Sequence, residues 1–375
     1  MDDVQFSDVG RALVLGMNQE EENLYIQQSL AHLVVEKITG LLFHKANATV
    51  GPLVTNYFSF IFFIEIHTGL GLKRVFVKIP KENLLKGSKS ILPISSADRC
   101  MAEDEVHSLR TLADQWQSDD LGVSWVRFRG FFPQYNAIVT EAAEGIEAFA
   151  VFRKLDLMRL MGSKNTRFRL GRAMSRFGQA LGRFHHKNTK KMLFRLSDDI
   201  PKLERYCCEL DSILRSRWPR RVLAILRSRE YLKFETMEVP TLKGIDVRNA
   251  LMDEHDSLFL FDPGRMKRTC CEADLARFIM TYRIIYWGST LFFLRLRPDA
   301  QAEKEFLEAY YSCTMVSNKK LLSLFLIKEQ LKHWHTAIGS LLFRPWPTPL
   351  KRFVAATYVN PFYTRQLGRE IKRVI

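Results

Sequence analysis

The chain has few cysteines, and their spacing is not that of a metal site. Its 375 residues include six cysteines, four of which form the adjacent pairs Cys207–Cys208 and Cys270–Cys271. The sequence has no CxxC spacing and no histidine cluster near a cysteine, which argues against bound zinc. We therefore expect reduced thiols in a cytoplasmic protein.

The sequence also lacks a long uncharged apolar run and a secretory leader. The most apolar stretch, 57-YFSFIFFIEI-66, contains Glu65 and is too short to span a bilayer. The longer stretch 279–296 contains Arg283, which favours a buried or amphipathic helix. Segment 1–22 is acidic and has no basic region before an apolar core, so we expect no signal peptide.

Acidic residues are scarce relative to basic ones. Fifty-six Lys and Arg against forty-one Asp and Glu leave a formal net charge of +15. Such a charge favours anionic partners: nucleotides, nucleic acid, phosphorylated sugars or an anionic membrane face. The apolar content of 47% is ordinary for a globular protein.

The first part of the chain predicts a helix followed by an antiparallel sheet. Apolar residues recur at helical spacing in 18–44, and two runs rich in aromatic and β-branched residues flank a glycine-containing turn. The order strand, strand, helix, strand, strand is typical of an α+β fold. The segments after residue 51 are strands 57–66 and 74–79, a helix over about 97–116, and strands 123–128 and 136–141.

Helical periodicity dominates after residue 143. Two short strands, 250–252 and 258–261, interrupt it, and a basic segment with several prolines, 344–375, follows the last helix. The sequence therefore predicts a second, mainly helical region.

Two charged residues in the first region have the character of a phosphate site. Lys78 lies in the apolar strand 75-VFVKI-79, and Glu105 lies on the same helical face as Leu109 and Leu112. Such a carboxylate could pair with the lysine and hold it toward phosphate. Taken alone, each residue is also typical of a solvent-facing charge.

Two further residues offer hard oxygen ligands. Asn249 and Asp262 flank the expected hairpin, and both suit Mg²⁺. Asn and Asp are also common in turns, so neither is specific by itself.

Together these residues resemble the protein-kinase-like superfamily. The ordered set is Lys78, Glu105, the strand end 139-VTE-141, Asn249 and Asp262, with thirteen residues from Asn to Asp. It is most similar to the branch of aminoglycoside phosphotransferases, choline kinases and lipopolysaccharide kinases.

Two helical segments extend the resemblance, which covers roughly residues 50–310. The segment 180-ALGRFHH-186 is similar to the L-x-x-L-H helix ending of that branch, and 273-ADLARF-278 to its D-L-A-R segment. The resemblance implies a two-lobed α+β fold with a small antiparallel-sheet N-lobe and a mainly helical C-lobe. The implied parts are a helical extension (1–49), the N-lobe (50–142), the C-lobe (143–343) and a basic aromatic tail (344–375).

The resemblance also implies a nucleotide site for ATP. Lys78 would contact the α- and β-phosphates, and Glu105 would hold Lys78. The backbone at Glu141, Ala142 and Ala143 would take the adenine edge.

The same resemblance implies a metal site. Asn249 and Asp262 would ligate Mg²⁺, and Asp274 would brace the catalytic loop from the following helix. Pro263 replaces the usual residue after the metal Asp. The phosphate-covering loop would lie at 49-TVGPLVTN-56, which has one glycine and no G-x-G-x-x-G.

One departure from the family pattern is serious. The pattern H-G-D-x-x-x-x-N becomes 242-LKGIDVRN-249, with Gly244 in the place of the aspartate. In one interpretation, Asp246 is a displaced carboxylate that still orients the acceptor hydroxyl, because phosphoryl transfer depends on positioning. In the other, the base is lost and the chain is a pseudokinase that serves as a nucleotide-binding or regulatory module. The presence of both the Lys78–Glu105 pair and the metal-ligand pair Asn249 and Asp262 favours an active phosphotransferase.

The distribution of basic residues bears on the acceptor. Segment 153–191 has twelve Lys or Arg and one acidic residue, Asp156, while 344–375 has seven basic residues, several aromatics and Glu370. Solvated helix faces explain such patterns too. Together with the lipopolysaccharide-kinase resemblance, they predict an anionic sugar or glycolipid acceptor in lipopolysaccharide biosynthesis and peripheral contact with an anionic inner membrane face. No recognition motif supports nucleic acid.

Overall fold

The computed structural model of the chain has two compact units. It describes residues 18–40, 47–56, 58–69, 71–82, 90–116, 118–214, 217–287, 289, 294, 296–313, 318–342 and 346–374. The first unit comprises Met1–Gln115, Trp125–Glu144 and Pro263–Arg265, and the second comprises Trp116–Ser124, Gly145–Asp262 and Met266–Ile375. Most of the acidic N-terminal segment lies outside the described residues.

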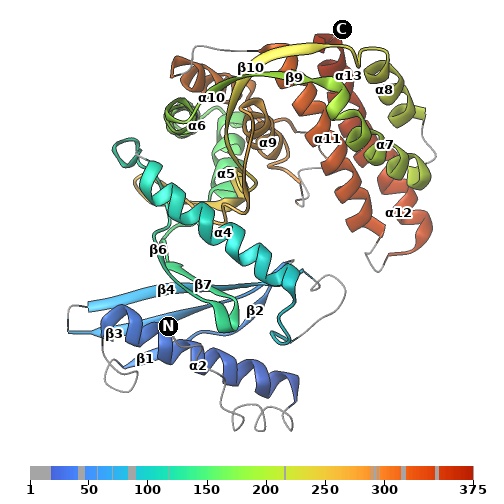
Figure 1. Ribbon diagram of the computed structural model, residues 1–375. Helices are drawn as coiled ribbons and strands as arrows, with labels where there is room; N and C mark the ends of the chain where they lie inside the picture. The colour runs from blue at the N-terminus through green and yellow to red at the C-terminus, as the bar shows by residue number, and fades with distance from the viewer. Residues whose placement is uncertain are drawn as a thin grey trace. The chain divides into compact units, whose positions relative to one another are not determined.

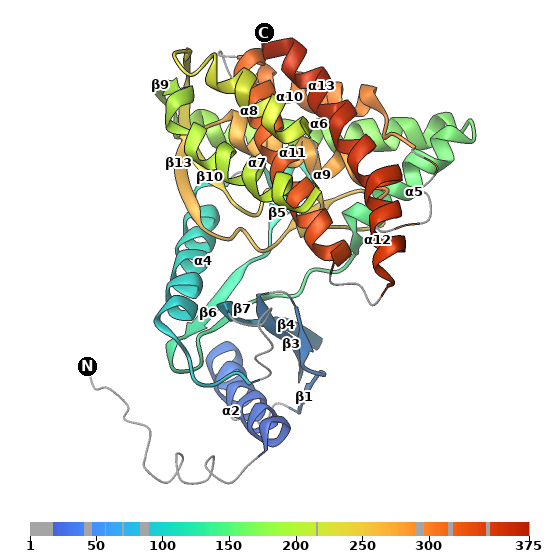
Figure 2. The same ribbon diagram turned by 90° about the vertical axis from the view of Figure 1, so that its right-hand side faces the viewer.

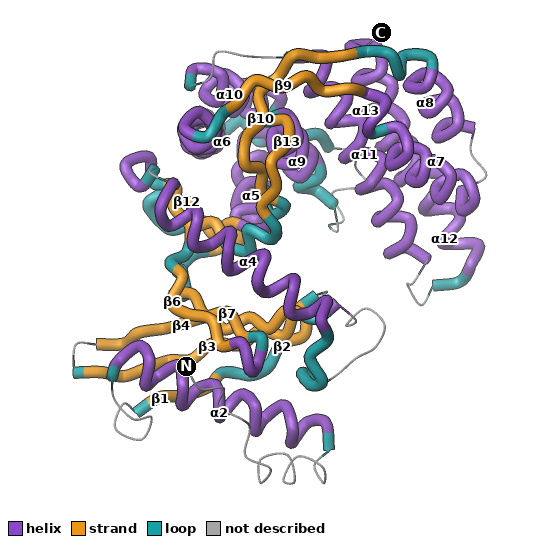
Figure 3. Tube along the Cα trace, in the orientation of Figure 1, coloured by secondary structure: helices purple, strands orange, loops and turns teal. Residues whose placement is uncertain are grey.

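The first unit is an antiparallel sheet with two long helices (Figures 1 and 3). The sheet order is β1-β3-β4-β7-β6, and β2 also pairs with β3. The predicted α+β character is confirmed. The elements are α2 (Gln19–Thr39), β1 (Ala48–Val50), β2 (Val54–Thr55), β3 (Ser59–Thr68), β4 (Gly71–Pro80), α4 (Ser96–Gln115), β6 (Phe128–Phe132) and β7 (Ala137–Glu141).

Strand alternation gives this sheet two different faces. Val77 and Val139 point to the face that α2 covers, where they join one apolar cluster. Ile138 lies on the opposite face and packs against α4. Lys78 is directly opposite Ile138 in the ladder, so it shares the α4 face.

The segment expected to cover phosphates, 49–56, is not a loop. Its two strands, β1 and β2, both pair with β3, so the segment is an interrupted edge strand. The chain turns into β3 only after Asn56, whose backbone N–H donates to the Ser59 carbonyl at 2.8 Å. The sequence prediction was wrong because a glycine and a proline inside an edge strand have the composition of a turn.

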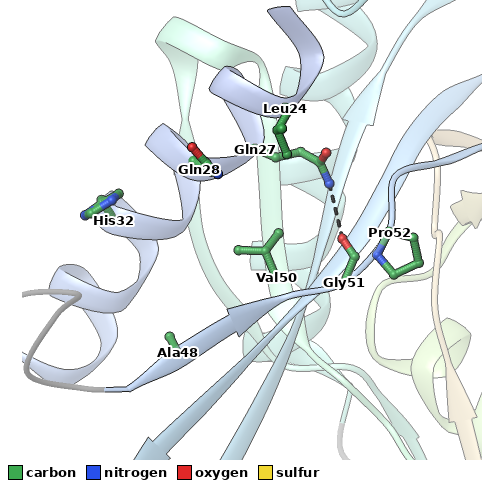
Figure 4. A pocket seen from close by; sticks show the side chains of 8 residues that line it. All are labelled: Leu24, Gln27, Gln28, His32, Ala48, Val50, Gly51 and Pro52. Atoms are coloured by element: carbon green, nitrogen blue, oxygen red, sulfur yellow. Dashed lines mark hydrogen bonds between the residues drawn. The ribbon is translucent and has the colours of Figure 1, made fainter. Parts of the chain in front are cut away.

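The interruption at Gly51 is held from both sides. Its N–H donates to the Phe63 carbonyl at 2.9 Å, and a Cβ at this position would lie 2.7 Å from the Phe63 ring. Gln27 of α2 donates its side-chain N–H to the Gly51 carbonyl at 3.3 Å (Figure 4). Beside this bond, α2 and β1 line a hollow of about 630 Å³. This hollow lies on the α2 face of the sheet, whereas Lys78 lies on the α4 face.

The second unit is mainly helical and contains two small sheets (Figure 3). One has the order β13-β10-β9 and the other β5-β12-β11-β8. Its helices are α5 (Ala148–Leu160), α6 (Lys164–Lys187), α7 (Ile200–Leu214), α8 (Arg217–Arg227), α9 (Glu272–Arg283), α10 (Ala300–Ser312), α11 (Lys319–Leu342), α12 (Thr348–Val354) and α13 (Asn360–Val374). Its strands are β5 (Val123–Trp125), β8 (Ile146–Glu147), β9 (Lys190–Arg195), β10 (Lys233–Leu242), β11 (Ala250–Met252), β12 (Leu258–Leu260) and β13 (Met266–Cys270).

Two expectations for the chain's elements need correction, and one sheet was not expected. The single strand expected at 123–128 is two strands, since β5 pairs with β12 and β6 pairs with β7. The apolar stretch 279–296 is not one helix, because α9 ends at Arg283; several later residues of the stretch lie outside the described ranges. The sheet of β9, β10 and β13 was not predicted.

The last part of the chain is folded. A π-helical segment (Ala355–Val359) joins α12 to α13, and α13 packs along α11 (Figure 2). Tyr363 is buried and stacks on Trp334, with ring centroids 5.9 Å apart and planes 9° apart. Across the described ranges, no helix is both long enough and apolar enough to span a bilayer.

Glycines allow α6 and α10 to approach each other closely. A Cβ at Gly178 would lie 2.2 Å from the backbone oxygen of Phe306, and one at Gly182 would lie 2.8 Å from that of Tyr310. These are backbone atoms, which cannot rotate away. The close packing of the two helices therefore requires glycine, which has no side chain, at these two positions.

We predict that Gly178→Ala destabilises the second unit by about 1–3 kcal/mol, because overpacking outweighs the gain in helix propensity. The matched control is Gly339→Ala in α11, where a Cβ meets nothing within 4 Å. That variant should gain up to about 1 kcal/mol. Urea unfolding followed by circular dichroism gives both values. Equal effects of the two variants would contradict close packing at Gly178.

Candidate functional site

Lys78 and Glu105 form a two-pronged ion pair in the first unit. The Lys78 Nζ donates to both carboxylate oxygens, at 2.9 Å to Oε1 and 2.7 Å to Oε2. The side chains are 16% and 8% exposed, respectively. Holding a charged lysine in a partly buried position requires such a partner. The pair fixes an ammonium group on the α4 face of the sheet.

The start of α4 is anchored to the end of β4. Ser95 and Asp98 form a capping box, in which the Asp98 N–H donates to Ser95 Oγ and the Ser95 N–H donates to Asp98 Oδ2. Asp98 also accepts from the Glu82 N–H at 2.7 Å, and Lys81 Nζ lies 3.5 Å from its carboxylate. Burial alone would raise the pKa of Asp98, but these hydrogen bonds lower it below its usual value. This anchor was not predicted, although the pattern Ser-x-x-Asp before the helix is a visible signal.

At the strand end expected to bind adenine, two backbone N–H groups already donate hydrogen bonds within the protein. The Glu141 N–H donates to the Arg127 carbonyl at 2.8 Å, and the Ala142 N–H donates to the Arg74 carbonyl at 3.1 Å. The Glu141 carboxylate contacts the Arg129 guanidinium. These bonds hold the chain straight as it leaves β7.

The second unit holds Asn249 and Asp262 at one end of the β11–β12 hairpin. The Phe261 N–H donates to the Asn249 carbonyl at 3.0 Å. The Asn249 side-chain N–H donates to the Gly244 carbonyl at 3.1 Å, and the amide oxygen takes no part in this bond. Asp262 has a left-handed backbone with φ of 51°, a strained conformation that Asp tolerates better than most residues.

Asp246 is buried and bound to its neighbour Arg248. Its carboxylate caps the short turn Val247–Asn249 and accepts from the Arg248 backbone N–H at 2.8 Å and from Nε at 2.9 Å. The Arg248 Nη2 also contacts the second carboxylate oxygen. Burial opposes the charge of Arg248, but the hydrogen bond and charge of Asp246 raise its pKa. Both oxygens of Asp246 are therefore engaged.

A buried network under the loop holds its first residue. Asp274 of α9 is fully buried, and its Oδ2 accepts from the Leu242 N–H at 2.9 Å. Arg277, one turn later, donates to Asp274 Oδ1 at 3.0 Å and to the Leu242 carbonyl. Both backbone groups of Leu242 are thus bound to α9, which matches the bracing expected of Asp274.

The second helical motif reaches the same network. The His185 Nε2 lies 3.4 Å from Asp274 Oδ2, and its Nδ1 lies 2.9 Å from the Tyr310 hydroxyl. The segments 180–186 and 273–278 therefore meet directly beneath the loop. The sequence indicated each segment, but not their contact.

Helix α11 carries two titratable residues with shifted pKa values, His333 and Glu329, that the sequence did not indicate. Burial lowers the pKa of His333 to about 4, with Glu329 acting in the opposite direction. Glu329 is itself buried; Lys332 and Arg277 lower its pKa against the effect of burial. Nothing in the spacing of α11 distinguishes these residues from solvated helix charges.

Much of the positive charge in 153–191 is compensated by distant acidic residues. Arg169 and Arg172 both bind Asp256. Arg183 lies 2.8 Å from Asp120, and Arg167 lies 3.4 Å from Asp299. The local charge around segment 153–191 is therefore less positive than the linear sequence of that segment indicates.

Comparisons with known proteins extend the fold argument. No protein-family model matches the sequence, and no curated protein matches it significantly. Among solved structures, choline kinase from Cryptosporidium parvum aligns over 92% of this chain and 94% of its own, with a TM-score of 0.55 and 12% identity.

Two further structures align less well. Spectinomycin phosphotransferase in complex with ADP and spectinomycin covers 91% of this chain and 98% of its own, with a TM-score of 0.48 and 12% identity. Glucosamine kinase in complex with glucosamine, ADP and inorganic phosphate covers 87% and 80%, with a TM-score of 0.47 and 12% identity. At such identities the likeness shows the fold alone. The chain has the protein-kinase-like fold, as the resemblance of its motifs predicted.

Proposed function

We propose that the protein is a phosphotransferase that uses ATP and Mg²⁺ to phosphorylate a hydroxyl of a sugar or glycolipid of the cell-envelope type. The observation that carries the proposal is the two-pronged Lys78–Glu105 pair. A lysine held by both oxygens of a carboxylate has its direction fixed, which is what a phosphate contact requires.

The nucleotide contacts follow from the first unit. We assign Lys78 to the α- and β-phosphates of ATP and Glu105 to holding it. For the adenine edge, Ala143 is the preferred donor of the expected set Glu141–Ala143, because the N–H groups of Glu141 and Ala142 already donate to carbonyls.

The residues of the β11–β12 hairpin fit Mg²⁺. Asn249 offers an amide oxygen whose direction is set by the bond from its nitrogen to Gly244, and Asp262 offers a carboxylate. Both are the hard oxygen ligands that Mg²⁺ prefers. When bound, Mg²⁺ would neutralise phosphate charge and orient the transferring group. Asn249 and Asp262 belong to the second unit, and Lys78 belongs to the first.

We assign the acceptor side to the loop that contains Asp246. Asp246 would orient the acceptor hydroxyl, and Lys243 and Arg248, both exposed, would favour an acceptor that carries negative charge. An anionic sugar or glycolipid of lipopolysaccharide biosynthesis would be such an acceptor, and it would be reached from the cytoplasmic side of the membrane. The loose transition state of phosphoryl transfer asks for positioning more than for a strong base.

A second candidate function has a specific observation in its favour. Both oxygens of Asp246 are engaged by Arg248, and Gly244 stands in the place of the family aspartate. A carboxylate bound in this way must release its partner before it can accept a proton or a hydroxyl. This geometry favours a catalytically silent protein that binds nucleotide and acts through a partner.

The nucleotide assignment predicts ligand stabilisation. ATP with Mg²⁺ should raise the melting temperature of the wild type, since saturation at about 100 times Kd is worth about 2.7 kcal/mol. Lys78→Met should remove most of this shift, and Asp262→Ala should remove its dependence on Mg²⁺. The matched control is Lys73→Met, an exposed lysine on the same strand, which should leave the shift intact. Differential scanning fluorimetry measures all four proteins.

If the wild type shows no shift with ATP in either the presence or the absence of Mg²⁺, both the enzyme and the nucleotide-binding module are excluded. A shift that survives Lys78→Met would exclude the phosphate role of Lys78.

The acceptor assignment predicts that Asp246→Asn lowers kcat by about 10²–10⁴-fold, the usual contribution of a positioned acid or base. The nucleotide-induced thermal shift should remain, because Asp246 is not assigned to ATP. The assay is phosphate transfer to a panel of lipid-linked glycans, with Asp262→Ala as the inactive reference. Turnover lost in Asp262→Ala but unchanged in Asp246→Asn would refute the role of Asp246. A wild type that binds nucleotide and transfers no phosphate would favour the silent protein.

A further inference from the structure

The turn between α5 and α6 exposes large apolar side chains. Met161 is 78% exposed, Phe168 is 67% exposed and Leu160 is 47% exposed. Exposed apolar residues are ordinary when they are scattered singly, but here they gather within nine residues of one helical hairpin.

The chain reverses direction sharply at this hairpin end. Helix α5 ends at Leu160 and α6 begins at Lys164, so the chain reverses over Met161, Gly162 and Ser163. Gly162 has φ of 95°, a conformation that favours glycine and sharpens the reversal. In Figure 2 the green turn between α5 and α6 lies at the right-hand edge of the helical unit.

The two helices of this hairpin also carry exposed basic side chains. Lys154 and Lys164 are exposed on α5 and α6. The Arg172 guanidinium lies over the Phe168 ring, 5.6 Å from its centroid. Residues 153–172 include seven Lys or Arg, and their acidic partners within salt-bridge distance are the three aspartates Asp156, Asp256 and Asp299. The hairpin end therefore keeps a positive charge after its ion pairs are formed.

We propose that this hairpin end docks the protein on an anionic lipid surface. Met161, Leu160 and Phe168 would enter the headgroup layer, and Lys154 and Lys164 would meet the lipid phosphates. Exposed apolar side chains with exposed lysines on the same two helices suit a headgroup layer, which has both an apolar and an anionic part. A nucleic acid would use the cations but would leave Met161 and Leu160 in water.

The C-terminal segment is an alternative site of lipid contact. Tyr363 is buried, but Trp346, Leu350 and Phe353 are exposed, so this segment needs its own control in the test. The proposed docking is independent of catalysis. It would place the phosphotransferase proposed above beside a membrane-anchored acceptor.

Vesicle co-sedimentation of the full chain tests the proposal without any assay of activity. The vesicles contain equal parts of phosphatidylglycerol and phosphatidylcholine, and pure phosphatidylcholine vesicles serve as the reference. We expect binding to the anionic vesicles that weakens as salt is raised from roughly 0.1 to 0.5 M. The double variant Met161→Ser/Phe168→Ser should weaken binding by roughly tenfold or more, as should Lys154→Glu/Lys164→Glu.

Matched controls change equally exposed residues elsewhere. Tyr231→Ser/Phe353→Ser removes two exposed aromatics, one of them on α12, and Lys319→Glu/Lys320→Glu reverses two exposed lysines at the start of α11. The apolar control should bind as the wild type does, and the charge control should retain most of the binding. Because all these side chains are exposed, melting temperatures should be unchanged, and they are measured in parallel.

Three results would overturn the proposal: no preference for anionic vesicles, equal losses in the hairpin variants and their controls, or a loss confined to the Phe353 control. Binding to a duplex oligonucleotide that both hairpin variants abolish, without vesicle binding, would assign the surface to nucleic acid instead.

Discussion

The loop 243–249 of the second unit depends on the buried carboxylate of Asp274. It binds the backbone N–H of Leu242, while Arg277 binds the carbonyl of the same residue, so the entry to the loop 243–249 is fixed at both polar groups. A buried carboxylate is costly unless its oxygens are paired, and here Arg277 and the loop backbone supply the partners. Helix α9 and the loop therefore stabilise each other. The positions of Asn249 and the β11–β12 hairpin follow from this anchor.

In the first unit, a capping box fixes the start of a helix in a similar way. Asp98 and Ser95 fix the start of α4 at the end of β4, and Glu105 on that helix then meets Lys78 on that strand. In each unit a buried carboxylate, Asp98 or Asp274, binds backbone N–H groups and fixes a neighbouring element. These two carboxylates are more buried than those of Glu105 and Asp246.

The loop 243–249 is ordered by hydrogen bonds among its own residues. Gly244 gives its carbonyl to the Asn249 side chain, and Asp246 caps the turn that carries Asn249. Asp246 therefore supports the proposed metal ligand whether or not it also meets an acceptor. Arg248 binds this carboxylate and is itself half exposed, so a ligand phosphate could compete for it.

The sequence by itself determined the fold class, the strand that carries Lys78, the helix that carries Glu105 and the hairpin between Asn249 and Asp262. These are local: each depends on periodicity, turn residues or spacing within a short segment. The tertiary structure decided what each charge meets. Asp256 neutralises arginines some eighty residues away, Asp274 binds the backbone of Leu242 from a later helix, and the strand of 49–56 is recognised only by its pairing with β3. Ion pairs and strand ladders join residues far apart in the chain, and a pattern read along the sequence has no information on which distant partner will be close.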